Sequence, residues 1–186
     1  MKIFKARRQA IAVVTCVIMA VTLPPLVGKT AYIWAIWAAL CVVASAIAIH
    51  DLATMLIPDR YTLGILFVGF AEWLLVSGDV KMLILYMCGA LLLGGALYLF
   101  DISYARLRGQ TGLGMGDIKL LSVSALLVGV SGTGIQTLLA AAAALTFISL
   151  RAIRLGRPLR AVAKVPFGTF LAPALVIVWA WLPAAW

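Results

Sequence analysis

Asp51 is an acidic residue at a position where a carboxylate does not stabilise the helix that carries it. It follows His50 at the C-terminal end of an apolar segment, where the helix dipole is negative and disfavours a carboxylate. Two interpretations fit the sequence equally well: a surface ion pair with a base such as Arg60, or a carboxylate kept for chemistry. His50, as a neutral neighbour, is interpreted as a bystander.

Asp117 lies in "GLGMGDIKLL", residues 112 to 121, behind three glycines. An acid in the first turn of a helix is favourable to the helix dipole, but that role does not need Gly112, Gly114 and Gly116. Gly112 and Gly116 also have the GxxxG spacing that lets helices meet backbone to backbone. We therefore expect the glycines to let Asp117 approach a second carboxylate closely.

Two carboxylates that meet can perform the chemistry of an aspartyl protease. One takes a proton from water as the water attacks a peptide carbonyl, while the protonated partner stabilises the developing oxyanion. Repulsion between the two charges and partial burial let such a pair hold one proton near neutral pH. Asp51 and Asp117 are the pair that we expect to be catalytic.

The elements that must position these acids are membrane-spanning helices. Of the 186 residues, 65% are hydrophobic and 11% are charged, which is more apolar surface than a soluble domain can bury. The apolar segments are close to the roughly 20 residues that cross a bilayer. They cover 9–28, 30–50, 61–76, 82–100, 120–150 and 165–186. "GVSGTG" at 129 to 134 divides the fifth into two spans, so the predicted fold is all-α and polytopic, with about seven transmembrane helices.

The basic residues predict the orientation of these helices. The N-terminus imitates a signal peptide but is interpreted as the first span, with its start in the cytoplasm. All fifteen Lys and Arg except Lys29 and Lys81 then fall on the cytoplasmic side, as the positive-inside rule requires. The net charge of +9 therefore needs no nucleic acid, and the basic segment 151–164 is suited to anionic lipid headgroups. Asp51 and Asp117 come to lie at the same cytoplasmic membrane edge.

The other acids have simpler interpretations. Asp59 stands after Pro58, where an N-cap of the third span is favoured. Asp79 and Asp101 are interpreted as solvated loop charges. Glu72 lies near the outer end of the third span and is expected to reach the interface or a partner, because acids inside a membrane are costly.

Cysteine and histidine usage argues against a metal centre or another cofactor. Cys16, Cys41 and Cys88 all fall in predicted spans without a CxxC pair, and the chain has one histidine. We expect a single domain, 1–186, in which an extra N-terminal span, 1–29, precedes a core, 30–186. The oligomeric state is left open.

Three motifs resemble those of the type IV prepilin peptidases, which are membrane aspartyl proteases of the GxGD type. "IHDLATMLIPDRYTLG", 49–64, is similar to the first catalytic block of that family, and "GMGDIKLL", 114–121, to its GxGD block. "KVPFGTFLAPAL", 164–175, resembles the closing Pro-Phe-Gly-Pro-Phe-Leu segment, with Thr169 in place of the second proline. The resemblance implies that Asp51 and Asp117 are catalytic. It makes Pro58, Gly114, Gly116 and Lys119 motif residues, and the family form often has Asn at the position of Asp59.

The resemblance also implies a substrate and a location. Prepilins or pseudopilins would lose a basic leader, ahead of an apolar helix, at the cytoplasmic face of a bacterial inner membrane. The chain lacks the CxxC-bearing cytoplasmic insertion of larger members, so a compact peptidase form is expected and methylation of the product is left open. Two alternatives stay open: a proton-coupled transporter with Asp51 and Asp117 as a relay, and a non-catalytic membrane scaffold.

Overall fold

The computed structural model describes residue 15 and residues 18–23, 29–155 and 166–182, and these form helices joined by short connections. The helices are α2 (Ala31–Thr54), α3 (Asp59–Glu72), a π-helical continuation η2 (Trp73–Ser77), α4 (Val80–Arg108), α5 (Met115–Leu155) and α6 (Gly168–Trp181). The all-α prediction is confirmed for this part of the chain. Three helices, α2, α4 and α5, are long and apolar enough to cross a membrane, and α6 is a shorter apolar helix.

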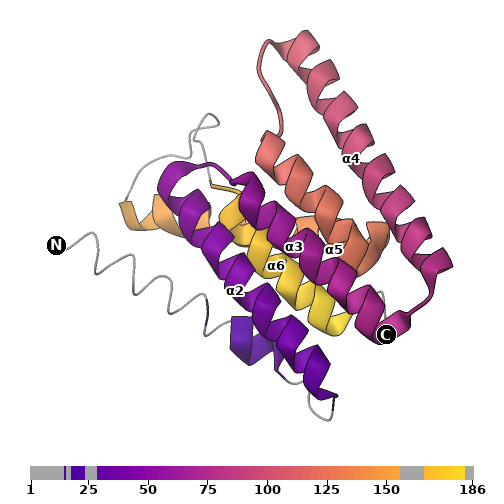
Figure 1. Ribbon diagram of the computed structural model, residues 1–186. Helices are drawn as coiled ribbons and strands as arrows, with labels where there is room; N and C mark the ends of the chain where they lie inside the picture. The colour runs from indigo at the N-terminus through magenta and orange to yellow at the C-terminus, as the bar shows by residue number, and fades with distance from the viewer. Residues whose placement is uncertain (1–14, 16–17, 24–28, 156–165, 183–186) are drawn as a thin grey trace.

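The predicted division of the fifth apolar segment is confirmed. α5 consists of two helical arms, because Gly129 adopts a non-helical conformation with φ 71° and ψ 171°. Figure 1 shows the chain reversing direction there. The count of seven spans stays a prediction, since most of the first predicted span lies outside the described residues. Residues 18–22 are helical and join the bundle through Trp37, whose Nε1 donates to Thr22 Oγ1 at 2.8 Å.

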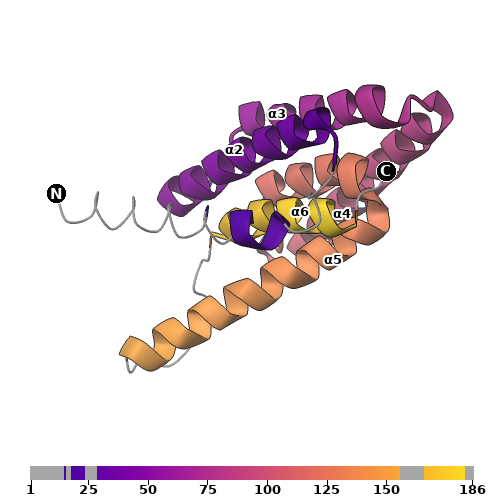
Figure 2. The same ribbon diagram turned by 90° about the horizontal axis from the view of Figure 1, so that it is seen from below.

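The core lies around α6, which is sandwiched between α2 and α5 (Figure 2). α6 is the most deeply buried helix, with Leu171, Leu175 and Trp179 fully enclosed. α3 packs against both α2 and α5, while α4 contacts mainly α5 and stands at the edge of the bundle (Figure 1). The C-terminal ends of α2 and α4 and the N-terminal ends of α3, α5 and α6 meet at one end of the bundle. We call this the site end.

Candidate active site

Asp51 is buried because it continues the core-facing stripe of α2. Buried residues recur along this helix every three or four positions, as expected for one helical face, and Ala44, Ile47 and Ala48 lead directly to Asp51. Its exposed fraction is 4%. The helix stops one turn later at Met55, which has the left-handed conformation with φ 55° and donates its N–H to the Asp51 carbonyl. Asp51 is therefore held inside the last turn, and an exposed ion pair with Arg60 is excluded.

The carboxylate of Asp51 is bonded by the first turn of α6. Thr169 donates its backbone N–H to Asp51 Oδ2 at 2.7 Å, and its hydroxyl lies 3.1 Å from the same oxygen. The Thr169 hydroxyl is also 3.3 Å from the Ala48 carbonyl, one turn earlier on α2. The first N–H groups of a helix have no acceptor within the helix, so Asp51 satisfies one of these donors from outside.

Asp117 reaches the same region from α5. It lies half-buried in the first turn of that helix, and the charge of Asp51 acts on it electrostatically. Gly114 leaves room for its side chain, since a Cβ built there would lie 3.0 Å from Asp117 Oδ2. The two acids that the sequence singled out thus lie near one another at the site end.

Ile57 fills the space between the segments that carry the two acids. A Cβ built on Gly116, beside Asp117, would lie 3.0 Å from Ile57 Cβ, and one built on Gly168 would lie 2.7 Å from Ile57 Cδ1. The same Cβ on Gly168 would lie 3.0 Å from Asp51 Oδ2. Glycines at 116 and 168 therefore allow the close packing around Ile57. Gly116 contacts the α2–α3 connection, however, and not Asp51 as the sequence had suggested.

Asp101 corrects one expectation. It is not a solvated loop charge, since α4 continues to Arg108 and leaves Asp101 only 7% exposed inside the helix. Its Oδ1 accepts the backbone N–H groups of Gly112 and Leu113, both at 2.8 Å. A buried acid on α4 thus holds the glycine segment that leads into α5 and Asp117. The apolar-run criterion missed it because that run ends at Phe100, whereas the helix does not.

The model of the type IV leader peptidase family matches residues 38–150, which is more than half of the chain and includes Asp51, Asp101 and Asp117. The chain belongs to the type IV leader peptidase family. It is 34% identical over 135 residues to a prepilin leader peptidase/N-methyltransferase of Burkholderia pseudomallei, covering 72% of this chain and 42% of that protein.

A second member of the leader peptidase family supports the same relationship. A prepilin leader peptidase/N-methyltransferase of Aeromonas salmonicida is 31% identical over 177 residues, covering 91% of this chain and 54% of that protein. The chain therefore spans about half the length of these relatives. No solved structure is significantly similar to it.

Asp59 and Lys119, both within the range that matches the leader peptidase family, form an ion pair. Asp59 is not the N-cap of α3, because Pro58 occupies that position and Asp59 is the first residue of the helix. Its Oδ1 instead lies 2.7 Å from Lys119 Nζ, with both side chains largely exposed. Asp59 therefore pairs with Lys119 and does not cap the helix, and this partner could not be inferred from the local sequence.

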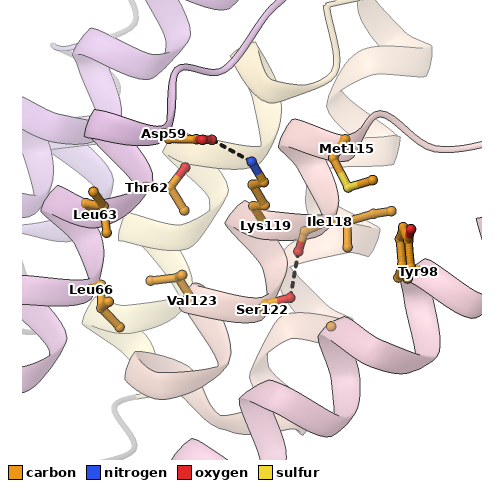
Figure 3. Close-up of a pocket in the computed structure, with 11 residues that line it drawn as sticks. Asp59, Thr62, Leu63, Leu66, Tyr98, Met115, Ile118, Lys119, Ser122 and Val123 are labelled. Atoms are coloured by element: carbon orange, nitrogen blue, oxygen red, sulfur yellow. Dashed lines mark hydrogen bonds and ion pairs between the residues drawn. The ribbon is translucent and has the colours of Figure 1, made fainter.

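A cavity of about 480 Å³ lies beside this ion pair, between α3, α4 and α5 (Figure 3). Its lining is mostly apolar and includes Met115, Ile118, Lys119 and Ser122 from α5. These four residues recur every three or four positions and share one helical face, whereas Asp117 lies on another. Neither Asp51 nor Asp117 lines the cavity, so it is separate from the carboxylate pair of this family member.

Glu72 and His50 each have a hydrogen-bond partner elsewhere in the fold. Glu72 is fully buried, and its Oε1 accepts the indole N–H of Trp179 at 2.8 Å, which joins α3 to α6. The ring of His50 lies 3.0 Å from the Leu56 carbonyl through Nδ1 and so contacts the α2–α3 connection. Cys41 is buried and Cys88 exposed, while Cys16 lies outside the described residues. Within the described ranges, no three His, Cys, Asp or Glu side chains are grouped to hold a metal ion.

Proposed function

We propose that the protein is a membrane-embedded aspartic endopeptidase that removes the basic leader from type IV prepilins or pseudopilins. The observation that carries the proposal is that Asp51 and Asp117 lie close enough at the site end to interact electrostatically, in a chain of the leader peptidase family. The relatives are named for prepilin leader cleavage, and both acids lie in the matched range.

The chemistry follows from two carboxylates that share one proton. The ionised member accepts a proton from water while the water oxygen attacks the carbonyl carbon of the scissile bond. The protonated member gives its proton to the carbonyl oxygen, and a neutral tetrahedral intermediate forms. The intermediate collapses with cleavage of the C–N bond, as one member of the pair gives its proton to the leaving amine and the other takes the proton of one hydroxyl group of the intermediate. The pair then returns to its starting charge.

The position of the pair suits a substrate that is part polar and part apolar. Asp51 is in the last turn of α2, a helix long enough to cross a bilayer, and Asp117 is in the first turn of the shorter α5 arm that ends at Gly129. The basic residues favour the cytoplasmic side of a bacterial inner membrane for this end. A basic leader then stays in water while the apolar helix that follows the scissile bond remains in lipid.

Asparagine substitutions test the pair. Asparagine keeps the size and polarity of aspartate but cannot exchange the proton, so Asp51→Asn and Asp117→Asn should each lower cleavage at least about a hundredfold. The measurement is cleavage of a prepilin from the same genome in membranes, at matched expression. Asp79→Asn, an exposed change at the start of α4, serves as the control and should cleave like the wild type.

The outcome also separates the alternatives. Full activity of Asp51→Asn would show that the pairing is wrong, and Asp59→Asn would then be the next variant to measure. If the wild type cleaves no prepilin, the peptidase proposal fails and the proton-relay alternative moves ahead.

A further inference from the structure

Thr169 contacts one oxygen of Asp51 twice, and this makes the two oxygens of that carboxylate unequal. Backbone N–H and hydroxyl both approach Oδ2, at 2.7 and 3.1 Å, while no described residue donates to Oδ1. The hydroxyl has a single proton to share between Asp51 and the Ala48 carbonyl, and the contact with Asp51 is the shorter of the two. Two donors on one oxygen fix both the position and the rotation of the carboxylate.

The donors come from a rigid element. Thr169 is in the first turn of α6, whose Gly168, Leu171 and Leu175 are buried in the core. The backbone of Gly168 lies against the same oxygen and leaves no room for a Cβ. Because α6 is packed on both sides, by α2 and α5, the two donors cannot follow the carboxylate if it swings away.

From this geometry we infer that Thr169 is a positioning residue for the reaction, holding Asp51 by Oδ2 so that Oδ1 is the oxygen available to water. This inference rests on the proposed function. A carboxylate that is already oriented needs no reorganisation when water attacks, so the contribution of Thr169 belongs to the chemical step and not to substrate binding.

Three substitutions separate the two hydrogen bonds. Thr169→Ser keeps both donors, and Thr169→Val has nearly the same shape but loses the hydroxyl. Thr169→Pro removes the backbone donor as well, and the first turn of a helix tolerates proline. Thr146→Val is the matched control, because Thr146 is exposed and its hydroxyl bonds only within its own helix, to the Ala142 carbonyl.

The measurement is kcat and KM for prepilin cleavage by the full-length protein in detergent. Hydrogen bonds to charged groups are strong, so we expect about a tenfold fall in kcat for Thr169→Val and about a hundredfold fall for Thr169→Pro. KM should stay within about twofold in each. Thr169→Ser should recover kcat to within about twofold of the wild type, as should Thr146→Val.

Binding gives a second readout that is independent of turnover. A peptide with a hydroxyl in place of the scissile carbonyl resembles the tetrahedral intermediate and engages the oriented carboxylate. Thr169→Val should weaken its binding by the same factor as it lowers kcat, whereas binding of an uncleaved substrate-like peptide should not change. If Thr169 had a purely structural role, Thr169→Val would change the affinities for both peptides equally or would leave both unchanged.

The results distinguish this inference from the proposed function. Normal cleavage by the wild type, loss in Asp51→Asn and full kcat in both Thr169→Val and Thr169→Pro would overturn the role of Thr169 alone. A rise in KM with unchanged kcat would also overturn it, since Thr169 would then act on substrate binding. Equal cleavage by the wild type and Asp51→Asn would overturn the assignment of Asp51 to the catalytic pair, and the role of Thr169 with it, while absence of cleavage by the wild type would overturn the proposed function.

Discussion

Gly168 shows how little space surrounds the candidate catalytic carboxylate. An added Cβ would come within 3.0 Å of Asp51 Oδ2 and within 2.7 Å of Ile57 Cδ1. The isoleucine end is flexible and can move aside, whereas the carboxylate is held by Thr169 and cannot move without losing its hydrogen bonds. The methyl group would therefore displace Asp51.

We predict that Gly168→Ala lowers kcat about ten- to a hundredfold, because small misplacements of a reacting group are costly. Gly95→Ala on α4 is the matched control, since nothing lies within 4 Å of a Cβ there, and it should cleave normally. Adding Ile57→Val to Gly168→Ala removes the Cδ1 contact but leaves the one with Asp51. Recovery of cleavage in that double variant would show that Ile57, and not Asp51, is the group displaced.

At the scale of elements, the site depends on connections that are anchored by helices distant in sequence. Asp101 on α4 holds the segment before α5 through the N–H groups of Gly112 and Leu113. Both bonds end on Oδ1, so an asparagine oxygen could accept them as well. A negative charge is not needed for this contact, but an acceptor oxygen is.

We therefore expect Asp101→Ala to be far more damaging than Asp101→Asn. Alanine leaves two donors without their acceptor and should cost about 1–3 kcal/mol of stability, while asparagine should cost less than about 1 kcal/mol. Thermal unfolding in detergent measures this difference. Trypsin cleavage after Arg108, next to the segment, should accelerate in the alanine variant only. Equal trypsin sensitivity of the two variants would contradict an anchoring role.

The sequence predicted the positions of the helices better than it predicted the contacts of the acidic residues near their ends. Apolar segments located α2, α4, α5 and α6 and the break at Gly129, because membrane spans are marked by composition. The sequence-based prediction for Asp101 was wrong, since a helix can continue through polar residues beyond the end of its apolar segment. Asp59 was assigned to a cap because Lys119, its partner, is 60 positions away.

The sequence predicted only part of the candidate site, because a local pattern does not reveal contacts between residues distant in sequence. Asp51 and Asp117 stood out because each is an acid in an apolar setting, and their roles stay a prediction. Thr169 stood out in the sequence only as a departure from the closing motif, because its contact with Asp51 joins residues 118 positions apart. Contacts of that length are set by packing and not by local pattern.

At the scale of the whole molecule, stability and the proposed chemistry are located in different places. Glu72 and Trp179 join α3 to α6 inside the bundle, about 20 Å along α3 from its start at the site end. Acids inside an apolar region are costly unless hydrogen-bonded, so this contact contributes to holding the two helices together. The α4 helix, in contrast, exposes most of its leucines, as a helix facing lipid does.

We predict that Trp179→Phe lowers stability by about 1–3 kcal/mol, because the buried Glu72 carboxylate loses a donor. Cleavage measured well below the unfolding temperature should be unchanged, since the substitution is far from Asp51. Trp181→Phe is the control, as its indole donates to the Val21 carbonyl at a mostly exposed position, and it should cost less. A loss of kcat at low temperature would show that the two regions are coupled.

The bond between Thr169 and Asp51 also has a consequence for the order of events during synthesis. α2 leaves the ribosome long before α6, so the Asp51 carboxylate is present in the membrane while its donors have yet to be translated. A nascent chain that already contains both aspartates lacks the helix that orients one of them. Under the proposed function, a chain interrupted before α6 therefore has both aspartates but no donors to orient the Asp51 carboxylate.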